Sequence, residues 1–169
     1  GGTLITKEDN SLESAVISGI TCSNDDSKII LRNVPDTPGI AAKILSPISE
    51  AGIDVDVIVQ NVGSDKSTDF TFTVKNDLSE KAAKILKDLT EGFGGGEVEL
   101  VKDVSKVSVV GVGMKSHAGV AAQMFGALAN KKINIDMIST SEIKISVVVA
   151  KDKAEEAVIA LHDEFELDK

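Results

Sequence analysis

The sequence predicts an α+β protein made of two copies of one small unit, each an antiparallel sheet with helices on one face. Three observations support this prediction: an internal repeat, strands whose apolar residues alternate, and helices with one apolar face. The chain has 169 residues, 42% of them hydrophobic, which is enough for two small domains. Because it has no Trp or Tyr and only five Phe, aliphatic side chains must fill the cores.

The repeat appears when residues 38–42 are aligned with residues 118–122, a shift of 80. The register then holds without a gap as far as Asp56 and Asp136. Further on, residues 77–80 align with residues 152–155, a shift of 75, so the second copy lacks five residues between its middle strands. A match of this length indicates a duplicated structural unit.

Each copy begins with an apolar strand, at residues 28–34 and 106–112, followed by a helix. The first of these helices has apolar residues at 40, 44, 45 and 48, matched by 120, 124, 125 and 128, which share one helical face. Gly52 is expected to end it in the left-handed conformation. Alternating residues then predict strands at 53–60, 70–75 and 143–149, each with one buried face.

A second helix follows in each copy, with its apolar stripe starting near residues 78 and 154. Asp77 with Glu80, and Asp152 with Glu155, have the spacing of a reciprocal helix cap. Residues 97–101 supply the last strand of the first copy, whereas the second copy has no such segment after its helix. Residues 15–22 are therefore predicted to cross over and complete the second sheet.

This crossover places the first domain inside the second. The predicted domains are a linker at residues 1–14, a first domain at 24–102, and a discontinuous second domain formed by 15–23 and 103–169. The chain opens with Gly1 rather than methionine, which is typical of the interior of a longer chain.

Composition argues against several classes of function. The net charge is -9 and Arg32 is the only arginine, so a nucleic-acid surface is not expected. Cys22 is the only cysteine, and no Cys/His cluster has zinc spacing, so neither an internal disulfide nor a metal site is expected. No segment has the pattern of a membrane span or a secretion signal, which favours a cytoplasmic location.

Catalytic motifs are also absent from the sequence. No serine or cysteine has a nucleophile-elbow context, and residues 111–116 lack the glycine that precedes Lys-Ser in a phosphate loop. Asp54 and Asp56 have no metal cluster or base beside them in the sequence. No catalytic residue and no cofactor are therefore assigned to this chain.

Small-molecule binding has better support. In each copy a loop runs directly into a helix, at residues 34–39 and 113–119, and free N–H groups at a helix start can bind a carboxylate. Gly39 and Gly119 would allow a ligand to approach the backbone. Asp36 could bind an ammonium group, and Gln60 a hydroxyl. The competing interpretation is that Asp36 only caps the helix.

Four stretches closely resemble the regulatory region of bacterial aspartate kinases: V-P-D-T-P-G at 34–39, V-I-V-Q-N at 57–61, G-V-G-M-K-S-H at 111–117 and I-S-T-S-E-I-K-I-S at 138–146. The resemblance covers essentially the whole chain. It implies two ferredoxin-like βαββαβ domains of the ACT type, which bind amino acids. It also implies feedback inhibition of aspartate phosphorylation, on the route to lysine, threonine and methionine, by threonine and possibly lysine.

The resemblance further implies the site residues and partners. A threonine-type effector site would use Asp36, Gly39, Ile40, Ala41, Gln60, Asn134 and Ile135. A second, lysine-type site would use Ile53, Asp54, Asp56, His117, Gly119, Val120, Ala121, Ser141 and Glu142. Some members of the family have Thr where this chain has Ala121, which weakens the case for lysine.

The expected partners are a second copy of the chain, joined through the ACT domains, and a kinase catalytic domain or alpha subunit, to which ATP and Mg would belong. Three alternatives remain: an ACT region of another enzyme such as an aspartate kinase–homoserine dehydrogenase fusion, a free-standing sensor or interaction module, and an acylphosphatase-like enzyme. An acylphosphatase-like enzyme would need arginine side chains to bind the phosphate of its substrate, and Arg32 alone hardly supplies them.

Overall fold

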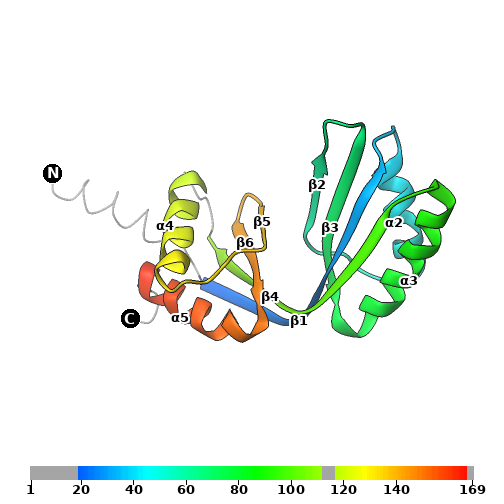
Figure 1. Cartoon of the computed structure of the whole chain (residues 1–169). Coiled ribbons are helices and arrows are strands. Elements are labelled where there is room, and N and C mark those ends of the chain that lie inside the picture. The colour runs from blue at the N-terminus through cyan, green and yellow to red at the C-terminus, as the bar shows by residue number, and fades with distance from the viewer. Residues whose placement is uncertain (1–18, 112–116, 167–169) are drawn as a thin grey trace. The chain divides into compact units, whose positions relative to one another are not determined.

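The computed structural model describes residues 19–111 and 117–166, which fall into two compact units (Figure 1). The inserted unit comprises residues 25–104, and the outer unit comprises residues 19–24, 105–111 and 117–166. The predicted linker at 1–14 and the beginning of the predicted strand at 15–22 lie outside the described residues.

The inserted unit runs from the last part of β1 to the first part of β4, in the order of a β-α-β-β-α-β fold. Its elements are β1 (Gly19–Pro35, from residue 25), α2 (Ile40–Glu50), β2 (Ile58–Val62), β3 (Ser67–Lys75), α3 (Asn76–Phe93) and β4 (Glu97–Val110, to residue 104). The strand order is β2-β3-β1-β4, and Leu31 of β1 and Gln60 of β2 both lie opposite Phe70 of β3.

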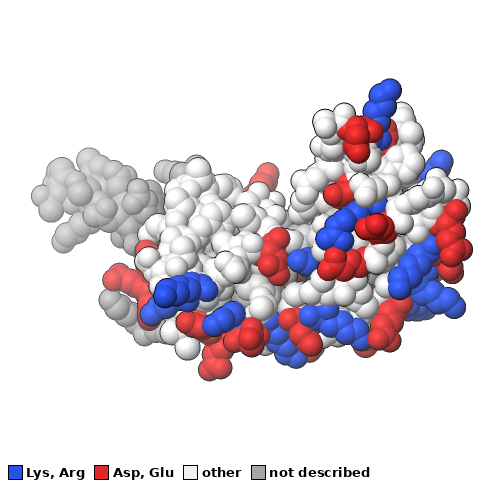
Figure 2. Space-filling view, in the orientation of Figure 1, with Lys and Arg blue, Asp and Glu red and all other residues white. Residues whose placement is uncertain are grey.

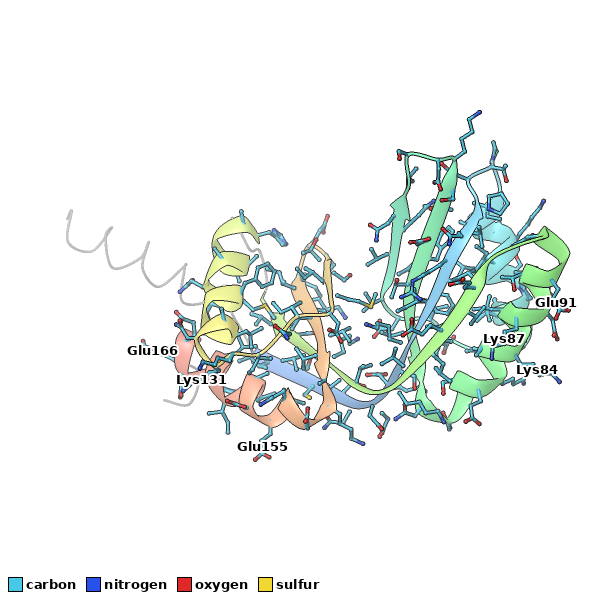
Figure 3. The ribbon with its side chains drawn as sticks, in the orientation of Figure 1. Lys84, Lys87, Glu91, Lys131, Glu155 and Glu166 are labelled. Atoms are coloured by element: carbon cyan, nitrogen blue, oxygen red, sulfur yellow. The ribbon has the colours of Figure 1, made fainter. Side chains whose placement is uncertain are left out.

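One apolar core joins this sheet to both helices. Ile29, Leu31, Phe70 and Phe72 of the strands pack with residues of α2 and α3, and each of these four side chains is at most 2% exposed. Both helices therefore cover the same face of the sheet (Figure 1). Figure 3 shows Lys84, Lys87 and Glu91 projecting from α3 into solvent.

The outer unit repeats this arrangement with a strand taken from the beginning of the described chain. Its own elements are α4 (His117–Asn130), β5 (Met137–Thr140), β6 (Lys144–Ala150), a 3-10 turn (Lys151–Lys153) and α5 (Ala154–Phe165). Their strand order continues as β1-β4-β6-β5. Val109, Met124, Ile145, Val147 and Leu161 are fully buried in its core.

The predicted fold class is thus confirmed: two α+β units with antiparallel pairing, helices on one face, and one unit inserted in the other. The exact domain boundaries proposed from the sequence stay a prediction. Residues 19–22 and the strand expected at 28–34 belong to one continuous strand, β1 (Gly19–Pro35). The strand expected at 97–101 and residues 106–110 likewise belong to one strand, β4 (Glu97–Val110). The intervening polar residues interrupt the apolar pattern, but polar side chains do not interrupt an extended backbone.

The predicted reciprocal caps are wrong. The backbone leaves β3 at Lys75 and enters α3 at Asn76, so the cap position falls on Lys75, which has no side-chain acceptor. Asp77 consequently lies within the first turn, where its charge interacts favourably with the helix dipole. In the second copy the 3-10 turn takes the place of the cap, and α5 begins only at Ala154.

The two copies end their first helix in the same way but with different residues. Gly52 has φ of +76°, as predicted, and its N–H bonds the carbonyl of Ser49 at 2.9 Å. Lys132 occupies the equivalent position with φ of +58°, and its N–H bonds the carbonyl of Ala129 at 2.9 Å. The geometry requires the left-handed region at this position, which a lysine adopts at a cost.

Replacing Lys132 by glycine should therefore stabilise the protein by about 0.5–1 kcal/mol, because glycine adopts this conformation without a Cβ penalty. The matched change Gly52→Ala should destabilise by about 1 kcal/mol from backbone conformation alone, since the added methyl group would meet no atom within 4 Å other than those of its chain neighbours. Urea denaturation followed by circular dichroism measures both. A Lys132→Gly variant that is less stable than the parent would contradict the argument.

Candidate functional site

The entry to α2 is open at its N-terminus. No side chain caps the helix, so the interpretation that Asp36 serves as its cap is wrong. Gly39 precedes the helix with φ of +88°; the N–H of Ile40 bonds the carbonyl of Thr37 at 3.1 Å, and that of Lys43 bonds Gly39 at 3.0 Å. Among the described residues, the amides of Ala41 and Ala42 have no backbone acceptor, so two N–H groups remain to bind an anion.

Asp36 and Gln60 are held by neighbouring residues of the β2–β3 hairpin. The backbone N–H of Asp36 bonds the carbonyl of Lys66 at 3.0 Å, and Gln60 Nε2 donates to Thr68 Oγ1 at 3.1 Å. Both side chains are exposed. Residues 66–68 thus hold the backbone of Asp36, which the sequence assigned to an ammonium, and the side chain of Gln60, which it assigned to a hydroxyl.

The turn of this hairpin is closed by Asp65. Its Oδ1 accepts hydrogen bonds from the Ser67 hydroxyl at 2.5 Å and from the Ser67 backbone N–H at 3.2 Å. These bonds favour the ionised carboxylate and lower the pKa of Asp65. This turn also positions the Lys66 carbonyl, which accepts the hydrogen bond from the backbone N–H of Asp36.

Several predicted site residues are core residues. Ile40 and Ile53 are 5% and 2% exposed within the core of the inserted unit, and Ala41 packs against that core. In the outer unit Val120, Ala121 and Ile135 pack against the core. The buried side chains of Ile40 and Ile53 cannot contact a ligand, whereas the other four residues are half-buried. The remaining predicted side chains are exposed: Asp54 and Asp56 before β2, and Asn134 and Glu142 in the outer unit.

In the outer unit the structure brings together two of the predicted residues. His117, the first residue of α4, has its Nε2 atom 2.6 Å from the carbonyl oxygen of Ser141 in the β5–β6 turn. The same turn is held by bonds from the N–H of Gly111 to Ile143 at 2.7 Å and from the N–H of Ser141 to Lys144 at 2.8 Å. His117 therefore ties the start of α4 to Ser141.

The two copies connect helix start and hairpin by different contacts. In the inserted unit the hairpin is five residues longer, and a backbone carbonyl, that of Lys66, contacts the loop before α2. In the outer unit those residues are missing, and among the described residues the Gly111 N–H and the imidazole of His117 contact the hairpin. The helix start is thus linked to the hairpin in both copies.

Lys66 and Thr68 were not identified from the sequence. Lys66 acts through its carbonyl, and a backbone role leaves no side-chain signal. Thr68 does leave one, because it shares a sheet face with Phe70, Phe72 and Val74 and is a polar residue in a buried position, 1% exposed. A hydroxyl at such a position must have a partner.

The single arginine is already paired. Arg32 Nη1 lies 2.6 Å from Glu99 Oε1, and this hydrogen bond raises the pKa of Arg32. A phosphate cradle would have to break this pair, which disfavours the acylphosphatase-like alternative. On the face shown in Figure 2, basic side chains lie among acidic ones rather than in a patch of their own.

Within the described part of the chain, no group of three or more His, Cys, Asp or Glu side chains could hold a metal ion. No helix among residues 19–111 and 117–166 is long and apolar enough to cross a membrane.

Comparisons with known proteins agree with the architecture. Models of the ACT domain match residues 29–91 and 107–165. The chain is 56% identical over 168 residues to an aspartate kinase of Pseudomonas fluorescens, covering 99% of this chain and 41% of that protein. It therefore spans about two fifths of the length of the curated relatives that it matches.

Two solved structures are similar over nearly their entire length. The ligand-free regulatory subunit of aspartate kinase from Thermus thermophilus is 41% identical, with a TM-score of 0.83 over 89% of this chain and 99% of that one. A structure of aspartokinase alpha and beta subunits is 42% identical, with a TM-score of 0.82 and the same coverage.

The His117 contact predicts a local effect on hydrogen exchange. In His117→Ala, the amides of Gly111 and Ser141 should exchange about five- to tenfold faster, because the turn that holds them loses one hydrogen bond. Amide exchange followed by NMR measures this, with the amide of Asp36 as the internal control in the other unit. Unchanged exchange at Gly111 and Ser141 would show that the imidazole does not hold the turn.

Proposed function

The chain belongs to the aspartate kinase family as a regulatory region of two ACT domains, and we propose that it binds threonine, and at a second site lysine, as feedback effectors. Effector binding would inhibit phosphorylation of aspartate by a kinase domain or alpha subunit that carries the ATP and Mg site. The observation that carries the proposal is the uncapped start of α2, with Asp36 and Gln60 anchored beside it by residues 66–68.

These groups match the three polar parts of threonine. The carboxylate would accept hydrogen bonds from the amides of Ala41 and Ala42, at the positive end of the helix dipole. The ammonium group would pair with the carboxylate of Asp36, and Gln60 would bond the side-chain hydroxyl. Gly39 keeps the approach to these amides clear, since even a Cβ at this position would meet no atom within 4 Å other than those of its chain neighbours.

A homodimer would complete the site. The end strands of the sheet order are β2 and β5, and Ile58 and Ile138, equivalent residues of these strands, are 46% and 44% exposed. Exposed edge strands with apolar side chains favour pairing with another chain. In such a dimer Asn134 and Ile135 would close the threonine site from the second copy.

Regulation then follows from a difference in affinity. An effector shifts the kinase only as far as it binds the inhibited arrangement more tightly than the active one. A site shared between two copies of the chain would provide this difference, because ligand contacts to both copies would be made in one arrangement only. The solved structure of aspartokinase alpha and beta subunits supports an alpha-type catalytic subunit as the partner.

The lysine-type site has weaker support. Its residues in the outer unit include Ala121, which offers no hydroxyl and packs against the core, while His117 is engaged with Ser141. Asp54, Asp56 and Glu142 supply the negative charge that a lysine side chain needs. We therefore expect a weaker response to lysine than to threonine.

Threonine should stabilise the 169-residue chain by roughly 2.7 kcal/mol at a hundred times its dissociation constant. The Asp36→Asn variant should bind threonine at least tenfold more weakly, because it loses a charge-assisted hydrogen bond. Asp88→Asn, at an exposed acidic position on α3, is the matched control and should bind as the parent does. Thermal unfolding and calorimetric titration measure both effects; no response of the parent to threonine or lysine would refute the proposal.

A further inference from the structure

We propose that Thr68 is a specificity-determining residue, which holds the Gln60 amide so that its oxygen faces the ligand and selects an amino acid with a hydrogen-bond donor in its side chain. This inference rests on the proposed function of the first site. It adds to that site a buried residue that does not itself touch the ligand, and it gives the chemical class of side chain that the site accepts.

The direction of the hydrogen bonds follows from the number of protons. The Thr68 hydroxyl has one proton, and it donates this proton to the carbonyl of Asn61 at 2.9 Å, which can only accept. Toward Gln60 the hydroxyl must therefore act as an acceptor. The Gln60 atom 3.1 Å away must be the donor Nε2, so the orientation of the amide is determined by the network.

Burial keeps this orientation in place. Thr68 is 1% exposed, so water does not reach its hydroxyl from the core side, and reversing the exposed Gln60 amide would place two oxygen acceptors against each other. Gln60 lies opposite Phe70 on β2, so it shares the sheet face on which Thr68 and the core side chains lie. Its Nε2 is directed to Thr68, and its Oε1 is left to accept from a ligand.

The second copy lacks this pair. In the repeat, Gln60 corresponds to Thr140 and Thr68 to Ile143, which is 51% exposed. The outer hairpin therefore forms without a buried hydroxyl at this place, and pairing of the two strands does not require one. The Gln60–Thr68 pair is specific to the copy to which the threonine-type site belongs.

The consequence is a rule for ligand choice. An acceptor oxygen can bond the hydroxyl of threonine, but it gains nothing from valine, which has a methyl group in place of that hydroxyl. Binding valine would also leave the Gln60 oxygen without its partner. In a site with a mobile amide, by contrast, Gln60 could rotate away and discrimination between the two would weaken.

A first experiment tests the network without any ligand. In NMR spectra of the 169-residue chain, one Gln60 side-chain amide proton should be protected from exchange, with its signal assigned by its loss in Gln60→Glu. Thr68→Val, which has the same shape without the hydroxyl, should lose this protection, and Thr68→Ser should keep it. Equal exchange in the parent and Thr68→Val would overturn the hydrogen bond itself.

A second experiment tests selectivity. Calorimetric titrations with threonine and valine should show the parent preferring threonine, with the preference reduced about tenfold in Thr68→Val and retained in Thr68→Ser. An unchanged preference in Thr68→Val would overturn the inference. If the parent binds neither amino acid, the proposed function fails, while the exchange experiment still decides whether Thr68 orients Gln60.

Discussion

The fold depends on two strands that are each divided between the two units. β1 passes from the outer to the inserted unit after Asn24, and β4 returns after Val104. β1 and β4 are neighbours in the sheet, so the first and last residues of the inserted unit lie side by side. Folding of residues 25–104 therefore brings the two strand segments of the outer unit together and reduces the entropy that closing such a long loop would cost. Where the chain crosses between the units, the Ser105 hydroxyl donates a hydrogen bond to Asn24 Oδ1 at 2.7 Å.

The repeat and the two hydrophobic periods were sufficient to predict the order of helices and strands, because each unit buries one face of each element. These patterns failed to predict strand ends, because β1 and β4 continue through runs of polar residues. Residues 23–27 are polar and resemble a turn, yet Ser27 is fully buried and its hydroxyl bonds Asn76. The reciprocal caps failed for a related reason: an acidic pair at the right spacing does not determine where the backbone enters a helix.

The site could be predicted only in part. Loops before helices and outward polar residues pointed to Asp36, Gly39 and Gln60, because these features depend on local sequence. The contribution of Lys66 and Thr68 depends on hydrogen bonds between strands, which a single sequence does not reveal. The family resemblance also could not separate backbone from side-chain roles: it placed Ile40 and Ile53 in the effector sites, but their side chains fill the core.

The two copies differ in hairpin length, the second being five residues shorter, and in the groups that join the hairpin to the segment before the helix. A backbone contact, such as that of Asp36 with Lys66, survives most substitutions at both positions, since every residue but proline has the N–H and every residue has the carbonyl. A contact made by the imidazole of His117 depends on that one side chain. The His117 contact is therefore removed by a single substitution of that side chain, whereas only a proline at position 36 would remove the Asp36–Lys66 bond. The two copies thus combine a contact that tolerates substitution with one that depends on a single side chain, a difference that would favour different specificities at the two proposed sites.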